Sequence, residues 1–319
     1  MTDTLPSDKA SGLRGALPLD AGEVGEGKDR LGPIGLFREM PWPVKLAALW
    51  LAFIVLGAIY AKIDDLLGQA LPLQDPNHQP RFGSGVERTE GPSMDHWLGT
   101  DVLRRDVFAR IVHGGWVSLI VATTAAAFGV VFGGLIGSFV GYVRGRTENV
   151  VMSGIDVILA FPPLILLLAM VSIWQVRNLF VISLVIGFLS IPAYTRVARA
   201  NTLAVANREF VHAAEAIGTK KNSILFREVI PNVLPTLLAY ALVQAAFVIV
   251  VEGTLSFLGL SVQLPTSTWG NMINEGRSEI KQTILVVLWP SLALTFTVLS
   301  LNQVGDWLQK RAAFRSSAL

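Results

Sequence analysis

The chain has 319 residues, of which 52% are hydrophobic and only 16% are charged, and its formal net charge is +2. Soluble domains carry about 25% charged residues, so this balance predicts a membrane protein, and the small net charge argues against a nucleic-acid partner. The absence of cysteine excludes disulfides, zinc–thiolate sites and a thiol nucleophile.

Residues 1–42 are rich in Gly, Pro, Asp, Glu and Lys, and they contain no apolar core long enough for a signal peptide. We predict a largely flexible cytoplasmic tail here, followed by an uncleaved first transmembrane helix at 43–65. The remaining segments are predicted in chain order as an extracytoplasmic loop at 66–115, a five-helix core at 116–309 with a cytoplasmic loop at 198–230, and a cytoplasmic tail at 310–319.

Six segments are long and apolar enough to be membrane spans, because about 20 apolar residues cross a hydrocarbon core of about 30 Å. They lie at approximately 44–63, 116–142, 149–173, 179–197, 233–257 and 283–307. With the N-terminus inside, Lys and Arg concentrate in the inner segments, and the first outer loop offsets its basic residues with acidic ones. The sequence therefore predicts an all-α membrane protein with six transmembrane helices and both termini in the cytoplasm.

The second predicted span carries a glycine at every fourth position: Gly129, Gly133, Gly137 and Gly141. On a helix these glycines share one face and allow another backbone to approach closely. Two interpretations stay open, namely packing within this chain and packing against a partner subunit.

Prolines lie inside or at the ends of several predicted spans: Pro162, Pro163, Pro192, Pro235 and Pro290. Each removes a helical hydrogen bond and tends to kink the helix. Kinks suit a pathway that opens and closes, but proline is also ordinary in membrane helices.

Two carboxylates, Asp156 and Glu252, lie within apolar segments. Because a charge at the bilayer centre costs at least about 2.5–3.5 kcal/mol on insertion scales, such groups usually face protein or water. For Asp156 we expect a structural ion pair or hydrogen bond, or else a place on a transport pathway. Glu252 is expected either to line such a pathway or to hold the following outer segment in place.

The polar stretch at 207–218 has the periodicity of a short helix. Phe210, Ala213, Ala214 and Ile217 follow i, i+3, i+4, i+7 and form one narrow apolar face. Gly218 suits a left-handed C-cap. Such a helix can rest on lipid headgroups, or its small residues can admit the groove of a partner protein.

The chain shows no constellation of catalytic residues. None of its four histidines lies within a predicted span, and no G-x-S-x-G or G-x-x-x-x-G-K-[ST] motif occurs. An intramembrane enzyme is therefore disfavoured, and ATP cannot be hydrolysed by this chain. A self-sufficient secondary transporter is a stronger rival, but there is no convincing internal repeat, and only two ionisable groups are available in the spans.

Three sequence blocks resemble the C-type permease subunits of bacterial dipeptide/oligopeptide/nickel ABC importers. His212–Gly218 with Ile230-Pro231-Asn232 is similar to the EAA loop of that family, in which a short helix docks into a cleft on the ATPase. Residues 99–108 are similar to its GTD-x-LGRDVFSR block, and Leu255–Gly259 with Thr268–Met272 to its LSFLG…SWGNM block. Together the blocks cover most of residues 95–310 in the order of the family.

The resemblance implies the type I ABC importer permease fold and a multi-pass location in the bacterial cytoplasmic membrane. It implies that the chain forms half of a translocation pathway together with a B-type permease, and that cytoplasmic ATPases and an extracytoplasmic substrate-binding protein complete the importer. ATP and Mg would be bound by the partner subunits, with no cofactor or metal on this chain. Short peptides are the expected cargo, and nickel, haem or another small solute is the alternative.

The resemblance also implies site residues. Contacts with the ATPase are expected from the loop helix: Phe210, His212, Ala213, Ala214, Glu215, Ile217 and Gly218. Contacts with the binding protein are hypothesised for the outer blocks, with Asp101, Arg104, Arg105, Trp269 and Asn271 as candidates; the alternative is a purely structural loop. Residues 103–113 are expected to form an amphipathic helix on the outer membrane surface that leads into the second span.

Three residues depart from the family pattern, and one of them is Glu228, at a position that is often apolar in the EAA pattern. His212 replaces the leading glutamate of the EAA motif, and Arg104 replaces a glycine. The change at His212 removes any salt bridge made by that glutamate, and we hypothesise that Glu215, one turn along, supplies an acidic contact instead.

Overall fold

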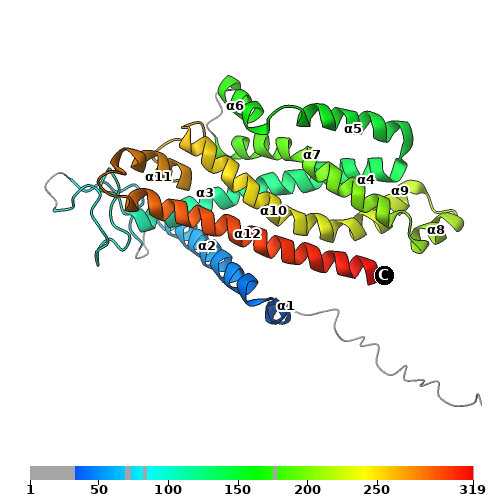
Figure 1. Ribbon diagram of the computed structural model, residues 1–319, viewed down its shortest axis with the longest axis horizontal. Coiled ribbons are helices and arrows are strands. Elements are labelled where there is room, and N and C mark those ends of the chain that lie inside the picture. The colour runs from blue at the N-terminus through cyan, green and yellow to red at the C-terminus, as the bar shows by residue number, and fades with distance from the viewer. Residues whose placement is uncertain (1–32, 69–72, 82–84, 175–177, 319) are drawn as a thin grey trace, which may run out of the picture. The chain divides into compact units, whose positions relative to one another are not determined.

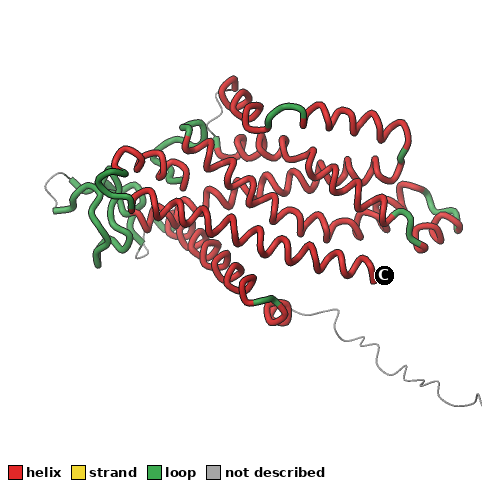
Figure 2. The backbone as a smooth tube through the Cα atoms, viewed as in Figure 1, coloured by secondary structure: helices red, strands yellow, loops and turns green. Residues whose placement is uncertain are grey.

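The computed structural model describes residues 33–68, 73–81, 85–174 and 178–318. These residues are almost wholly helical, and their one isolated β-bridge joins Thr100 and Asp106 (Figures 1 and 2). The chain divides into two compact units, Met1–Pro41 and Trp42–Leu319. The first unit contributes a short helix, α1 (Pro33–Glu39), from within the predicted tail, and the second is a helical bundle.

The bundle is built from long apolar helices joined by short ones. The long helices are α2 (Trp42–Leu66), α3 (Val107–Phe128) continued through a π-helical turn (Gly129–Gly133) into α4 (Gly134–Val143), α7 (Leu179–Val205), α10 (Ile230–Phe257) and α12 (Leu285–Ala318). The shorter elements are α5 (Gly145–Leu159), α6 (Pro163–Trp174), α8 (Glu209–Ala216), α9 (Lys221–Ile224), a π-helical turn (Leu225–Val229), α11 (Trp269–Gly276) and a 3-10 turn (Arg277–Glu279).

Five of the six predicted spans are continuous helices that are long and apolar enough to cross a membrane. The predicted third span, 149–173, is instead a bent pair, in which α5 and α6 meet at an angle of 78°. The bend coincides with Pro162 and Pro163, which remove backbone donors where the helix would otherwise continue. Pro192, Pro235 and Pro290 lie inside helices that continue through them.

Two helices begin or end at other residues than the sequence suggested. Residues 103–113 do not form a separate surface helix, because α3 begins at Val107 and runs without a break into the second span. Asp106 fixes this start as the N-cap, since its side chain accepts a hydrogen bond of 2.7 Å from the backbone N–H of Ala109. At the other end of the chain α12 continues through the segment predicted as a tail, 310–319, as far as Ala318. The cytoplasmic location of that segment stays a prediction.

The glycine face of the second span packs within this chain, against α7. A Cβ added at Gly133 would lie 2.6 Å from the Cβ of Tyr194, and one added at Gly137 would lie 2.6 Å from the Cβ of Ala198. Any side chain at these positions would therefore push the two helices apart. Of the two interpretations of the glycine face, the structure supports packing within this chain.

The bundle has two ends of different character (Figure 1). At one end α11 and the loop that precedes α3 lie together, and we call this the α11 end. At the opposite end the chain passes from α7 through α8 and α9 towards α10, and we call this the α8 end. Between the two ends α2 and several other helices expose large apolar side chains, for example Leu49 and Leu56, which suits a surface covered by lipid.

Candidate functional site

The predicted loop helix exists as α8 at the α8 end. Gly218 adopts a left-handed conformation after it, with φ of +79°. The N–H of Gly218 donates to the carbonyl of Glu215 at 3.0 Å, and that of Thr219 donates to the carbonyl of Ala214 at 3.1 Å. These bonds form a Schellman motif, which ends the helix with its last carbonyl groups satisfied.

The predicted apolar face of α8 points away from the bundle. Phe210 is 36% exposed and Ile217 is 82% exposed, and Ala213 between them is exposed as well. Ala214, at the edge of this face, packs against the core. No element of the described part of the chain therefore covers this small apolar surface.

A residue that the sequence analysis did not single out anchors α8. Val211 is fully buried and belongs to an apolar cluster with residues of α7, α9 and α10, including Val205, Ile224 and Val233. The helix thus has apolar residues on two sides. Val211 points into the bundle, and the face with Phe210 and Ile217 points outward. Displacement of α8 would be transmitted through Val211 to two of the long helices.

His212 and Glu215 lie on the exposed side of α8. The Nδ1 atom of His212 is 3.6 Å from Oε2 of Glu215, and the hydroxyl of Tyr142 donates to Oε1 of Glu215 at 3.4 Å. With Arg144 and Lys221 these side chains line a polar groove of about 330 Å³ beside α8. The groove and the apolar face together offer a surface on which a protein partner could be held.

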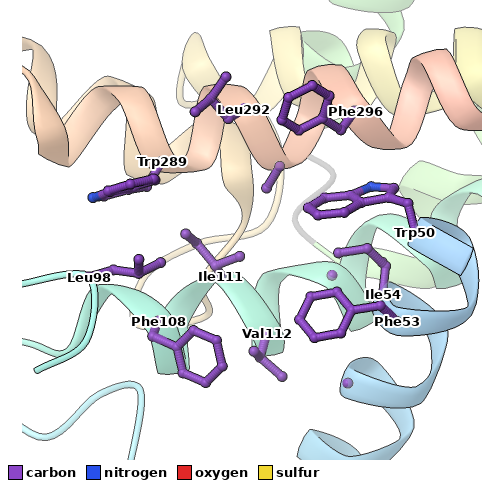
Figure 3. A pocket seen from close by; sticks show the side chains of 13 residues that line it. Trp50, Phe53, Ile54, Leu98, Phe108, Ile111, Val112, Trp289, Leu292 and Phe296 are labelled. Carbon is purple, nitrogen blue, oxygen red and sulfur yellow. The ribbon is translucent and has the colours of Figure 1, made fainter. Parts of the chain in front are cut away.

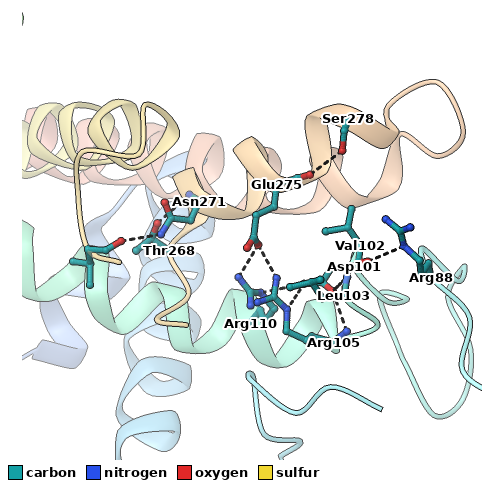
Figure 4. Close-up of polar contacts among 11 residues, drawn as sticks. Arg88, Asp101, Val102, Leu103, Arg105, Arg110, Thr268, Asn271, Glu275 and Ser278 are labelled. Carbon is teal, nitrogen blue, oxygen red and sulfur yellow. Dashed lines mark hydrogen bonds and ion pairs between the residues drawn. The ribbon is translucent and has the colours of Figure 1, made fainter. Parts of the chain in front are cut away.

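At the α11 end a buried ionic network joins α3 to α11 (Figure 4). Arg105 donates from Nε to Asp101 and from Nη2 to Glu275, both at 2.7 Å. Arg110 donates from Nη2 to the same oxygen of Glu275 at 3.0 Å, and its Nε lies 3.5 Å from Asp101. The side chains of Asp101, Arg105 and Arg110 are at most 5% exposed, so two guanidinium groups and two carboxylates neutralise one another away from water.

Four of the candidates for contact with the binding protein, Asp101, Arg105, Trp269 and Asn271, are buried in this chain, and their contact with that protein stays a prediction. Asp101 and Arg105 belong to the buried network. Trp269 is fully buried and donates from its indole N–H to the carbonyl of Ile111 at 3.0 Å, and Asn271 donates to the carbonyl of Val262 at 3.1 Å. These four side chains hold α11 and its neighbouring loop in place, whereas Arg104 is half-buried at a positive φ of +64°.

Glu252 is also buried, 1% exposed, near the end of α10. It accepts hydrogen bonds from the hydroxyls of Ser256 at 2.6 Å, Ser261 at 3.3 Å and Ser118 at 3.4 Å. These bonds connect α10 to α3 and to the segment that follows α10. The geometry favours the second of the two expectations for Glu252, a group that holds the following segment in place.

Asp156 forms an ion pair with Arg196, with Oδ1 2.6 Å from Nη2. Glu148 and Arg199 form a second pair between the same two helices, α5 and α7. The side chains of Asp156 and Arg196 are 60% and 53% exposed. We call these four residues the α5–α7 charged strip. The sequence analysis named Asp156 but missed its partners, although arginines inside an apolar segment are themselves a signal.

An apolar groove of about 270 Å³ lies between α2, α3 and α12 (Figure 3). Its lining contains no charged side chain, and Trp50, Phe108 and Phe296 are among the residues that form it. Such a largely apolar surface suits an acyl chain.

The chain is also similar in sequence to a known protein family and to known proteins. Residues 129–317 match the family described as binding-protein-dependent transport system inner membrane component. The chain is 36% identical over 220 residues to the glutathione transport system permease protein GsiD of Pectobacterium atrosepticum, covering 69% of this chain and 73% of that protein. It is 39% identical over 221 residues to a putative peptide permease protein of Brucella suis, covering 68% of this chain and 72% of that protein.

Proposed function

Because the chain belongs to the family of binding-protein-dependent transport system inner membrane components, we propose that it imports short peptides as one of two permeases in an ATP-driven complex. The membrane-permease role predicted from the sequence is confirmed by the family and by the names of the relatives. Peptide cargo is proposed because those relatives are named for glutathione and for peptides.

The observation that carries the proposal is the double-sided construction of α8. Its outward face, with Phe210 and Ile217, is available to a cytoplasmic ATPase. Its inward side chain, Val211, is packed with α7 and α10. When ATP closes the ATPase pair, a displacement of α8 would therefore reach the membrane helices, which makes α8 a coupling element with two states biased by nucleotide.

The remaining parts of the proposed complex are suggested by the family to which the chain belongs. The sequence contains no phosphate-binding loop, so ATP and Mg belong to separate ATPase subunits. A B-type permease would supply the other half of the pathway, and an extracytoplasmic binding protein would deliver the peptide at the α11 end. The α8 end would then face the cytoplasm of a bacterium, with the bundle in the cytoplasmic membrane.

The test is ATP-dependent uptake by the purified complex in proteoliposomes, with labelled dipeptides, glutathione, nickel and haem as competing cargoes. We expect peptide uptake that requires ATP, the ATPase subunits and the binding protein. Uptake of nickel or haem alone would replace the peptide assignment while leaving the permease role intact. Transport by this chain without an ATPase would contradict the proposal and favour a self-sufficient carrier.

The role of α8 is tested by Ile217→Glu, which places a charge on the outward face. We expect uptake to fall by about tenfold or more, because a charge in the centre of a docking surface removes a major anchor, and we expect less ATPase to co-purify. The matched control is Ile217→Leu, which keeps this exposed position apolar and should leave uptake unchanged. Normal uptake with Ile217→Glu would show that α8 is no coupling helix.

A further inference from the structure

We propose that the α5–α7 charged strip lines the aqueous part of the translocation pathway and guides the charged termini of a peptide along it. The strip consists of two carboxylates on α5, Glu148 and Asp156, and two guanidinium groups on α7, Arg196 and Arg199. This inference rests on the proposed function, because it names the residues that the peptide meets inside the same permease.

The strip lies on helices that belong to the apolar bundle. Arg196 and Arg199 are part of α7, which is long and apolar enough to be a span, and Asp156 is part of the bent pair α5–α6. The side chains of Asp156 and Arg196 are more than half exposed in this chain. Since charges beside acyl chains are costly, exposed charges on spanning helices face a water-filled cavity or a protein partner.

The packing of α7 shows on which side that water would lie. One face of α7 is closed by the glycines of the second span, with Gly133 against Tyr194 and Gly137 against Ala198. On its charged face α7 pairs with α5 through these two ion pairs, and among the residues of α5 only Ile155 is buried. The strip is therefore at an edge of the packed bundle, where a second permease can enclose a channel.

The break between α5 and α6 points to the same side. It begins four residues after Asp156, at Ala160, and turns the chain by 78°. An interrupted helix leaves backbone polar groups unpaired, and at membrane depth these are tolerated only where protein or a water-filled cavity satisfies them. Broken helices consequently often border substrate sites in transporters.

The chemistry of the strip fits a zwitterion with separated charges. A peptide with free ends carries an ammonium group and a carboxylate, and an arginine fork binds a carboxylate well. Because each group of the strip already has an ionic partner, an arriving terminus exchanges one ion pair for another. It is therefore held only weakly, as conduction requires. The two carboxylates lie eight residues apart, about 12 Å along a helix, and they offer two successive steps.

Uptake of dipeptides with opposite side-chain charge tests the inference in the reconstituted complex. With Arg196→Gln we expect the ratio of Ala-Glu to Ala-Lys uptake to fall by about fivefold, and with Asp156→Asn we expect it to rise by a similar factor. Opposite shifts cannot come from a general loss of structure, which would lower both uptakes together. The control is Arg146→Gln, an exposed arginine at the start of α5, which should leave the ratio unchanged.

Water access provides the second measurement, because the chain has no cysteine of its own. In a cysteine-free complex, Ser153→Cys, which is exposed on α5 near Asp156, should react with a membrane-impermeant charged thiol reagent, and peptide should slow the reaction. Phe53→Cys, on the apolar surface of α2, should not react.

The outcomes separate the two proposals. If the wild-type complex imports no peptide, the proposed function fails. If it imports peptides but both neutral variants keep the wild-type ratio, only the role of the strip is overturned. Labelling of Ser153→Cys by a lipid-soluble reagent alone would also overturn it, and would place the strip against lipid headgroups.

Discussion

The α11 end and the α8 end both carry polar, charge-rich sequence blocks, but the structure uses their charges in opposite ways. At the α11 end, Asp101, Arg105 and Arg110 are buried and share Glu275. At the α8 end, His212 and Glu215 are 61% and 46% exposed and form one loose pair. The first arrangement makes a rigid joint between α3 and α11, whereas the second leaves a surface that another protein can bind.

A charged motif is therefore not by itself a contact surface. Whether such a motif is exposed or buried depends on whether distant segments of the chain supply ionic partners for its charges. Glu275 lies 165 residues from Arg110 and 170 from Arg105, and it makes their burial tolerable. The α8 end has no such distant carboxylate among the described contacts of its loop helix, and its apolar side chains provide the attachment instead.

The largest expected effect is at the α11 end. Glu275→Ala leaves two buried guanidinium groups sharing one carboxylate, and we expect it to destabilise the fold by about 3–5 kcal/mol, as breaking a buried pair does. The measurement is thermal unfolding of the purified chain in detergent. The control is Glu279→Ala, whose partner Arg88 is 57% exposed, so that a change of only about 0–1 kcal/mol is expected. Equal melting temperatures for the two variants would mean that the network contributes no rigidity.

An intermediate effect is expected where α8 joins the bundle. Val211→Ala removes two buried methyl groups and should weaken the attachment of α8 by about 2 kcal/mol. Because α8 is a short peripheral element, we expect faster amide hydrogen exchange in α8 with little change in the long helices. The control is Val150→Ala on α5, a valine that is 73% exposed. Unchanged exchange in α8 would show that Val211 is not its anchor.

Much of this architecture could be predicted from the sequence because it depends on local pattern. Apolar length identified the long helices, the four-residue glycine period identified a close helix contact, and Gly218 marked the end of α8. The partner of the glycine face, α7, could not be predicted, because periodicity describes one surface and not the surface that meets it. Pro162 and Pro163 indicated a kink, but they did not indicate a bend of 78°.

Some residues of the candidate site could be predicted and others could not, because periodicity describes one surface and not the segment that packs against it. The outward face of α8 follows from helical spacing, and Phe210 and Ile217 are where that spacing put them. Val211 was missed because α8 is a short helix with apolar residues on two sides. Its periodicity therefore does not show which side is buried. The burial of the candidate contacts Asp101 and Arg105 could not be predicted, because only the fold brings Glu275 beside Arg105.

The smallest effect is expected from removing charge at the α8 end. Glu215→Gln keeps the side-chain shape and an acceptor for the hydroxyl of Tyr142, and it deletes only a half-exposed contact with His212 at 3.6 Å. We expect the stability of the chain to change by less than about 1 kcal/mol, because exposed ion pairs contribute little. If ATPase binding nevertheless falls in the assembled complex, Glu215 contacts the partner directly, in the place left by the glutamate that His212 replaces. A large loss of stability would instead show that the α8 end depends on its charges as the α11 end does, and the contrast between the two ends would fail.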